Sequence, residues 1–130
     1  MSIPRTVIQS WEAPKPIGPY SVGIKAGDLV FVSGMLGLDP SSGQLVAGGI
    51  EAQTKQSIRN IANILEAADS SLGLVVKTTV FLKDMSDFAK MNAVYGEAFR
   101  SEPPARSTVQ AAALPMNALI EIEAVALLRE

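Results

Sequence analysis

Arg106 and Glu121 are the residues of this chain whose types and settings best suit chemistry on a small molecule. Arg106 begins an extended segment behind Pro103 and Pro104, whose fixed backbone angles stiffen its approach. A guanidinium fork binds a carboxylate through two parallel hydrogen bonds. Glu121 stands in the strand-like run Ile120-Glu121-Ile122-Glu123-Ala124, where a half-buried carboxylate suits proton transfer to water. The two residues therefore predict a site that anchors a carboxylate ligand and activates water.

The chain contains no histidine and no cysteine, so its chemistry proceeds without the commonest general base and without a thiol nucleophile. A Ser-His-Asp triad and a disulfide framework are excluded, and the composition argues against a zinc site or another metal centre. The formal net charge is −2, and lysine and arginine are scattered singly. This pattern argues against a nucleic-acid-binding surface.

The 130 residues are expected to form one domain, 1–130, because no repeat or low-complexity linker divides them. Apolar runs have the length of strands, so no transmembrane span is expected. The first five residues lack the apolar core of a signal peptide. We therefore expect a cytoplasmic protein. A mitochondrial or plastid protein that has lost its targeting segment would show the same features.

Alternating apolar residues and turn signals predict strands, and an apolar period near 3.6 residues predicts two helices. Three prolines and a glycine make residues 13–20 an extended loop that delivers Tyr20 to a defined place. The expected elements are strands 5–9, 21–25 and 29–34, helix 50–68, strand 75–83, helix 87–99 capped by Ser86, and strands 106–112 and 119–128.

The element order β-β-β-α-β-α-β-β predicts an α+β sandwich in which two helices cover one face of a mixed sheet. Each helix carries an apolar stripe for that sheet, Ile58, Ile61, Leu65 and Ala68 on the first and Phe88, Met91, Tyr95 and Phe99 on the second. The opposite face of the sheet is also partly apolar, at Phe31, Val125 and Leu127. Because no helix remains to cover it, this face predicts a homo-oligomer whose sheets pack together.

A hairpin of the last two strands sets the relation between the two candidate residues. If these strands pair across Pro115, Gln110 lies opposite Glu121 and Arg106 lies opposite Val125. Arg106 and Glu121 then share a face but stand roughly 13 Å apart. A shared site needs long side chains that reach inward, a β-bulge, or a residue from a neighbouring subunit.

Over nearly its whole length the chain resembles the RidA family, the reactive intermediate deaminases formerly named after YjgF. The joint order of several short motifs carries the resemblance: Ile17-Gly18-Pro19-Tyr20, Val32-Ser33-Gly34, Val76-Lys77-Thr78-Thr79-Val80, Asp87-Phe88-Ala89 with Asn92, Pro104-Ala105-Arg106-Ser107, and Ala113-Leu114-Pro115 before Ile120-Glu121-Ile122-Glu123-Ala124. The resemblance implies a homotrimer with the chorismate-mutase-like fold and clefts between subunits. It also implies hydrolysis of small 2-imino acids, formed from enamines, to 2-oxo acids and ammonia.

The resemblance also implies a role for each site residue. Arg106 would bind the substrate carboxylate, and Glu121 would position or activate the attacking water. The cleft would be lined by Tyr20, Ser33, Gly34 and Asn92, with Thr108 near the bound ligand. An imine is already electrophilic, so this chemistry needs no metal and no cofactor.

The chain departs from many relatives at two positions. Thr108 replaces a cysteine, which removes any thiol-based redox response, and Met35 replaces a glutamine after Ser33-Gly34. Neither change removes the arginine or the glutamate. The substrate preference is the property that these changes leave open.

Several residues also fit a structural interpretation. Glu123 suits a solvated position on an edge strand. Asn92 suits either the cleft or the satisfaction of local backbone groups. Ser33 has no activating base and is expected to form hydrogen bonds. Two other functions stay open, the endoribonuclease or translation-inhibitor activity associated with some relatives and a non-enzymatic trimer that binds small metabolites.

Overall fold

The computed structural model describes residues 4–129, and its elements follow the predicted order β-β-β-α-β-α-β-β. Residues 1–3, on which part of the signal-peptide argument rests, lie outside the described residues. The strands are β1 (Arg5–Ile8), β2 (Gly23–Ala26), β3 (Leu29–Leu36), β4 (Val75–Leu82), β5 (Ala105–Gln110) and β6 (Ile120–Leu127); the helices are α1 (Gly49–Ala67) and α2 (Phe88–Ala98), with short 3-10 turns η1 (Leu72–Leu74), η2 (Met85–Asp87) and η3 (Pro115–Asn117).

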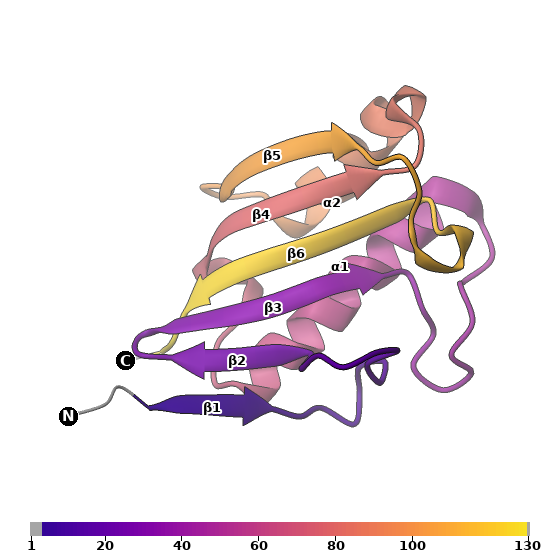
Figure 1. Cartoon of the computed structure of the whole chain (residues 1–130). Coiled ribbons are helices and arrows are strands. Elements are labelled where there is room, and N and C mark those ends of the chain that lie inside the picture. The colour runs from indigo at the N-terminus through magenta and orange to yellow at the C-terminus, as the bar shows by residue number, and fades with distance from the viewer. Residues whose placement is uncertain (1–3, 130) are drawn as a thin grey trace.

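The six strands form one mixed sheet in the order β1-β2-β3-β6-β4-β5. Neighbours are antiparallel except β4 and β5, which are parallel. Both helices lie behind the sheet in Figure 1, against the same face. The predicted α+β sandwich with two helices on one face is therefore confirmed. Among residues 4–129 the helices lack the length and apolar character needed to cross a membrane.

The predicted hairpin of the last two strands is wrong. β6 lies between β3 and β4, and β4 separates it from β5 at the edge of the sheet (Figure 1). Arg106 pairs with Thr78 of β4, and Thr78 in turn pairs with Ala124 of β6. β5 pairs with β4 and not with β6 because helix α2 connects β4 to β5 as a crossover. Such a crossover brings the next strand back parallel to β4, whereas a hairpin joins only antiparallel strands. Glu123 consequently lies on a central strand and not on an edge.

The core forms where the helix stripes meet the sheet. Ile58, Ile61, Leu65 and Ala68 of the first stripe are all buried, as predicted. On α2 the stripe is buried except for its first residue, because Phe88 is 38% exposed. The predicted Ser86 cap is also wrong, since the Asp84 side chain accepts a hydrogen bond from the Ser86 backbone N–H (2.9 Å). Asp84 thus caps η2, the turn that leads into α2.

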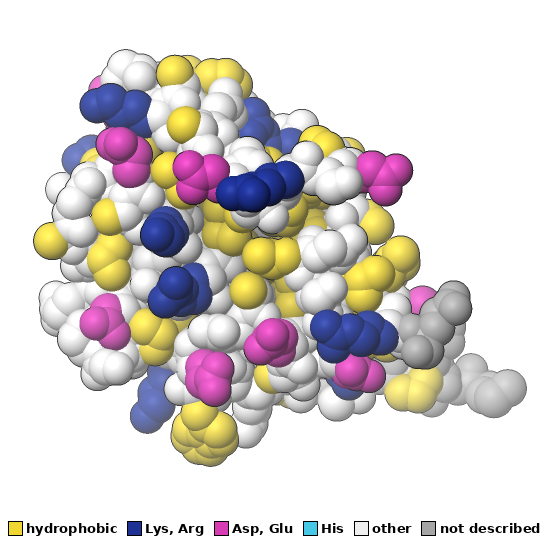
Figure 2. All heavy atoms as spheres, turned by 180° about the vertical axis from the view of Figure 1, so that it is seen from behind, with side chains coloured by type: hydrophobic (Ala, Val, Ile, Leu, Met, Phe, Trp, Pro, Cys, Tyr) yellow, Lys and Arg dark blue, Asp and Glu magenta, His cyan; other side chains and the backbone are white. Residues whose placement is uncertain are grey.

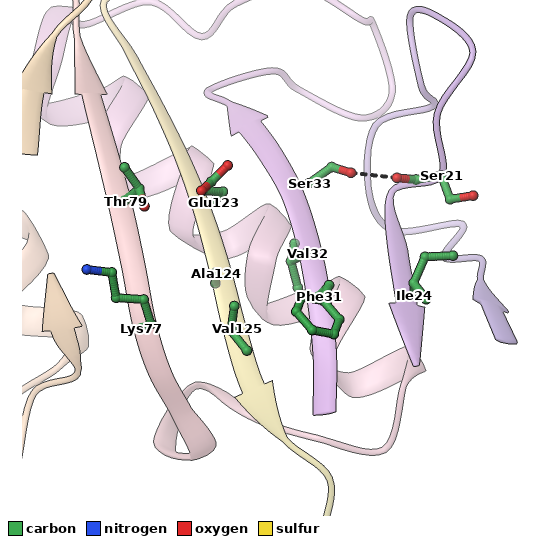
Figure 3. Close-up of a pocket in the computed structure, with 10 residues that line it drawn as sticks. All are labelled: Ser21, Ile24, Phe31, Val32, Ser33, Lys77, Thr79, Glu123, Ala124 and Val125. Atoms are coloured by element: carbon green, nitrogen blue, oxygen red, sulfur yellow. Dashed lines mark hydrogen bonds between the residues drawn. The ribbon is translucent and has the colours of Figure 1, made fainter. Parts of the chain in front are cut away.

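The helix-free face of the sheet is partly apolar, as predicted. Phe31 is 43% exposed and Leu127 42% exposed, and both side chains are large and hydrophobic. A shallow cavity of about 230 Å³ lies over this face, lined by the residues in Figure 3, with Lys77, Thr79 and Glu123 among the apolar ones. A single chain leaves this apolar surface in contact with water.

Candidate functional site

The candidate site residues fall into two groups on opposite faces of the sheet. Arg106 reaches the helix-covered face, where its guanidinium contacts Met91 and Tyr95 of α2. Glu121 belongs to the helix-free face, because it alternates along β6 with the buried Ile120 and Ile122. The sheet itself therefore separates the guanidinium from the carboxylate within one chain.

Arg106 is held by aromatic rings. The central guanidinium carbon lies 4.8 Å from the centre of the Tyr95 ring and 5.6 Å from that of Phe88, within the range of a cation–π interaction. Thr78 fixes the Tyr95 ring through a hydrogen bond between the two hydroxyls (2.7 Å). Burial raises the pKa of the Tyr95 hydroxyl, which keeps this ring neutral. The exposure of Phe88 therefore has a reason, since its ring packs against the arginine.

The Arg106 guanidinium has no carboxylate partner among residues 4–129, in which the single ion pair joins Arg129 to Asp69 (3.5 Å). Within the described residues, its side chain donates one hydrogen bond, to the Met91 sulfur at 3.9 Å, which is a weak acceptor. A partly buried cation with unused donors is well prepared to receive an anion.

Asn92 and Thr108 belong to the same group as Arg106. Thr108 lies two residues further along β5 and pairs with the buried Val80, so it points to the helix-covered face as well. The Asn92 Oδ1 atom and the Thr108 Oγ1 atom are buried and have no hydrogen-bond partner within the described chain. Buried polar atoms without partners are rare and costly, which makes Asn92 and Thr108 notable among the predicted site residues.

Glu121 lies against a β-bulge. Between Val32 and Met35, β3 has one residue more than β6, and the extra length is taken up at Ser33 and Gly34. A Cβ atom at Gly34 would overlap the Glu121 carboxylate, with the carboxyl carbon only 2.7 Å away. A side chain at position 34 would therefore displace the Glu121 carboxylate, and a bulge beside a functional side chain is a common way to aim it.

The Glu121 carboxylate lines a small cavity of about 40 Å³ at the end of the sheet. Tyr20 contributes to the same cavity from the loop that the sequence predicted, and its hydroxyl accepts a hydrogen bond from the Ile17 backbone N–H (3.3 Å). Lys15, also on this loop, is a cation in the wall that the sequence reasoning missed. Of the predicted residues, the structure therefore brings Tyr20, Gly34 and Glu121 together.

Ser33 takes part in a different contact. Its hydroxyl donates a hydrogen bond to the Ser21 backbone carbonyl (2.6 Å), the dashed line in Figure 3. This bond joins the bulge of β3 to the residues that precede β2. Ser33 is thus a hydrogen-bonding group, as expected, and its donor is already occupied within the chain.

The environment of Glu121 favours its protonated form. Burial raises the pKa of this carboxyl above its ordinary value of 4.5, and the nearby Glu123 carboxylate raises it further. A carboxyl with a raised pKa exchanges protons at a higher pH than an ordinary glutamate, which suits an acid–base group.

The raised pKa makes ionised Glu121 a cost to stability. We expect Glu121→Gln to melt at a higher temperature than the parent chain at neutral pH, and at the same temperature below pH 4.5. Because the folded chain holds this proton more tightly than the unfolded chain, stability falls as the pH rises from 4.5 through the folded pKa. Glutamine does not ionise and avoids that loss. Thermal melts across this pH range, with the exposed Glu66→Gln as control, measure it. Equal melting at neutral pH would contradict the expectation.

A third cavity, of about 470 Å³, adjoins the Glu121 cavity and shares Pro14, Lys15, Tyr20 and Val22 with it. Its other walls come mainly from β1 and the segment that follows, together with Ser21 and Pro40. The side chain of Trp11 stands at this surface and is 90% exposed. Large apolar surface thus continues from the Glu121 cavity towards the N-terminal strand.

Known proteins resemble this chain over most of its length. A family model described as endoribonuclease L-PSP matches residues 10–128. A RutC family protein of Pyrococcus horikoshii is 54% identical, over 94% of this chain and 97% of that protein. Human 2-iminobutanoate/2-iminopropanoate deaminase is 48% identical, over 97% of this chain and 92% of the relative. The crystal structure of Escherichia coli TdcF with bound serine superposes with a TM-score of 0.91 at 39% identity, covering 96% and 99% of the two chains.

Proposed function

This chain belongs to the RidA family, whose matching model is described as endoribonuclease L-PSP, and on that premise we propose that it hydrolyses small 2-imino acids to 2-oxo acids and ammonia. The substrates are 2-iminopropanoate, 2-iminobutanoate and acids of similar size. Relatives that bear the deaminase name support this activity. The observation that carries it is the Arg106 guanidinium, preorganised against aromatic rings and without a carboxylate partner in residues 4–129.

The active unit that we propose is a homotrimer with its clefts between subunits. In one chain Arg106 and Glu121 lie on opposite faces, on strands that β4 separates. The register places Arg106 level with Ala124, because both pair with Thr78, and Glu121 precedes Ala124 on β6 by three residues. This separation alone is about 10 Å along the strand. Side chains cannot bridge a sheet, so one cleft takes Arg106 from one subunit and Glu121 from the next. The uncovered apolar face supports the packing of copies that this requires.

In such a cleft, Arg106 binds the carboxylate of the imino acid through two N–H donors. We place Asn92 and Thr108 in the lining of this cleft, because the Asn92 Oδ1 and Thr108 Oγ1 atoms have no hydrogen-bond partner within the described chain. The serine held by TdcF supports this ligand class, because serine also carries a carboxylate next to a carbon that bears nitrogen.

Glu121 supplies the proton transfers. Its carboxylate takes a proton from water as the water oxygen bonds to the imine carbon, and the C=N double bond becomes a C–N single bond. The proton then moves to the nitrogen. Glu121 next takes the proton of the new hydroxyl group and passes it to the nitrogen, so that the C–N bond breaks, ammonia leaves, and the C=O bond of the 2-oxo acid forms. One water is consumed for each ammonia released, and no other reactant is required.

Hybrid trimers test the shared cleft. We expect Arg106→Ala and Glu121→Gln to be inactive alone and to regain activity when the two chains are expressed together. Each cleft needs Arg106 from one subunit and Glu121 from its neighbour, so about a third of the clefts in the purified hybrids contain both. The readout is 2-oxobutanoate release during threonine breakdown by a dehydratase, with hybrids purified through a different tag on each chain.

The control is a mixture of the two variant homotrimers, each purified separately and combined without subunit exchange. This mixture should stay inactive. If the purified hybrids are no more active than either variant alone, the shared cleft is wrong. If the parent chain itself does not accelerate 2-oxobutanoate release, the deaminase proposal is wrong.

The same measurements distinguish the proposed deaminase from the two alternative functions, an endoribonuclease and a binding module. An endoribonuclease would need a surface for RNA, yet the helix-covered face in Figure 2 shows acidic and basic side chains interspersed, and the net charge is −2. A binding module would hold 2-oxobutanoate without accelerating its formation. The cytoplasmic location stays a prediction.

A further inference from the structure

Helix α1 carries a row of buried polar side chains on its sheet-facing side, where an amphipathic helix ordinarily carries apolar residues. Gln53, Ser57 and Asn60 are spaced by four and three residues, which places them on one face of the helix. All three are buried, at 7%, 0% and 0% exposure. Burying polar groups costs free energy unless each finds a partner, and an apolar residue would pack here without that requirement.

Two members of the row hold the end of β3. The Ser57 hydroxyl donates a hydrogen bond to the Met35 carbonyl (2.7 Å). The Asn60 side-chain amide donates to the carbonyls of Leu36 (3.1 Å) and Leu38 (3.0 Å). Leu36 is the residue that pairs with Glu121 across β3 and β6. The strand directly beside Glu121 is thus fixed from the helix side.

The third member, Gln53, holds the beginning of β6. Its side-chain oxygen accepts a hydrogen bond from the Leu119 backbone N–H (2.9 Å), two residues before Glu121. The helix can approach this closely because Gly37 lies against Gln53, where an added Cβ would come within 2.6 Å of the helix backbone. Gln53 therefore reaches past β3 and fixes the strand that carries the proposed acid–base group.

We propose that Gln53 is a positioning residue that holds the Glu121 carboxylate against the β3 bulge, an inference that rests on the proposed function. Ser57 and Asn60 fix Leu36 on one side of Glu121, and Gln53 fixes Leu119 just before it. Between these two attachments the backbone of Glu121 has little freedom. Its carboxylate then stays over Gly34, in the small cavity where the substrate's imine carbon must meet a water.

Thr54 shows that burial of a polar group on α1 does not by itself have this effect. Its hydroxyl is fully buried, yet it donates only to the Ile50 carbonyl one turn earlier in the same helix (2.7 Å). Thr54 therefore makes no side-chain hydrogen bond to either strand. A Thr54→Val variant is a matched control for the loss of a buried hydrogen bond.

Gln53→Met tests the proposal, since methionine keeps the length of the side chain and removes the acceptor. We expect kcat to fall about tenfold with KM unchanged, because a small displacement of a catalytic group lowers the rate while Arg106 still binds the carboxylate. We also expect the titration midpoint of Glu121 to fall towards 4.5 as its carboxyl moves into water. Carboxyl-carbon NMR of glutamate-labelled protein measures this, with the Glu121 signal identified by its absence in Glu121→Gln.

The charged and titratable groups around Glu121 are Glu123 on its own strand and Lys15 and Tyr20 in the loop. None of them is changed in this comparison. Gln53→Glu keeps an acceptor oxygen in either protonation state and is expected to restore kcat, whereas the midpoint is compared only among the parent, Gln53→Met and Thr54→Val, because a carboxyl at position 53 would itself raise the pKa of Glu121. If Gln53→Met does not fold, Gln53→Ala takes its place, because water can then enter and solvate the Leu119 N–H.

A parent-like Glu121 midpoint and kcat in folded Gln53→Met would overturn the proposal, as would the same changes in Thr54→Val. The NMR titration requires no turnover. A parent chain without deaminase activity would therefore refute the proposed function and still leave the positioning of Glu121 measurable.

Discussion

Replacing Arg106 with alanine is expected to lower kcat/KM for 2-iminobutanoate by about 10²- to 10³-fold. Truncating one partner of a hydrogen-bonded charge pair out of contact with water commonly costs about 2–5 kcal/mol, roughly a 30- to 5,000-fold loss, which brackets this range. Here the substrate carboxylate is the partner left behind, since Arg106 has no carboxylate of its own within residues 4–129. The measurement is the rate of 2-oxobutanoate release from threonine by a dehydratase, with the parent and the variant added in parallel.

Arg106→Lys distinguishes the contribution of the positive charge from that of the planar guanidinium with its two parallel donors. Lysine keeps the positive charge, but it cannot donate two parallel hydrogen bonds or stack its head group on Tyr95 as a planar guanidinium does. We therefore expect only partial recovery. Arg129→Ala, which breaks the surface pair with Asp69, is the control and should retain the parent rate. Equal acceleration by the parent and Arg106→Ala would refute the role of Arg106.

Replacing Glu121 with glutamine is expected to lower kcat by about 10²- to 10⁴-fold, the usual contribution of a general acid–base group. Glutamine has nearly the same shape, so the cavity with Tyr20 and Gly34 is retained. Binding of 2-oxobutanoate, measured by calorimetry, should stay close to that of the parent, because Arg106 is unchanged. Loss of rate with retained binding is the result that identifies a hydrolase.

Glu123→Gln is the control for this prediction. Glu123 lies on the same strand and the same face, but it is exposed and lines the shallow cavity over the sheet. Its replacement should leave kcat within a small factor of the parent. If Glu121→Gln retains the full rate, Glu121 is not the acid–base group. If the parent chain binds 2-oxobutanoate but shows no deaminase activity, the protein is a binding module.

The element order and the helix-covered face could be predicted from the sequence, because apolar periodicity records which side of each element is buried. The pairing of the last two strands could not. The buried positions of β6, such as Ile120 and Ile122, suit any strand under the helices, whichever strands lie beside it. A signal for a central position was present, since Val125 and Leu127 make the other face of β6 apolar too.

The site residues were proposed from types and motifs, and their arrangement came only from the fold. With β4 between β5 and β6, Arg106 and Glu121 lie on opposite faces and not on a shared one. The sequence also gave no reason to connect Phe88 with Arg106, because an aromatic residue on a helix stripe is ordinarily core. Gln53 and Asn60 were missed for a related reason. Their partners are backbone groups of distant strands, which carry no sequence signature.

Trp11, the single tryptophan of the chain, gives the protein a built-in optical probe of its surface. Because its indole is 90% exposed in the folded chain, unfolding changes its surroundings little, and its emission is a poor reporter of denaturation. Anything that covers the large cavity beside it removes water from the ring and shifts its emission to shorter wavelength. Its fluorescence therefore reports what occupies the surface next to Tyr20, free from the background of any second tryptophan.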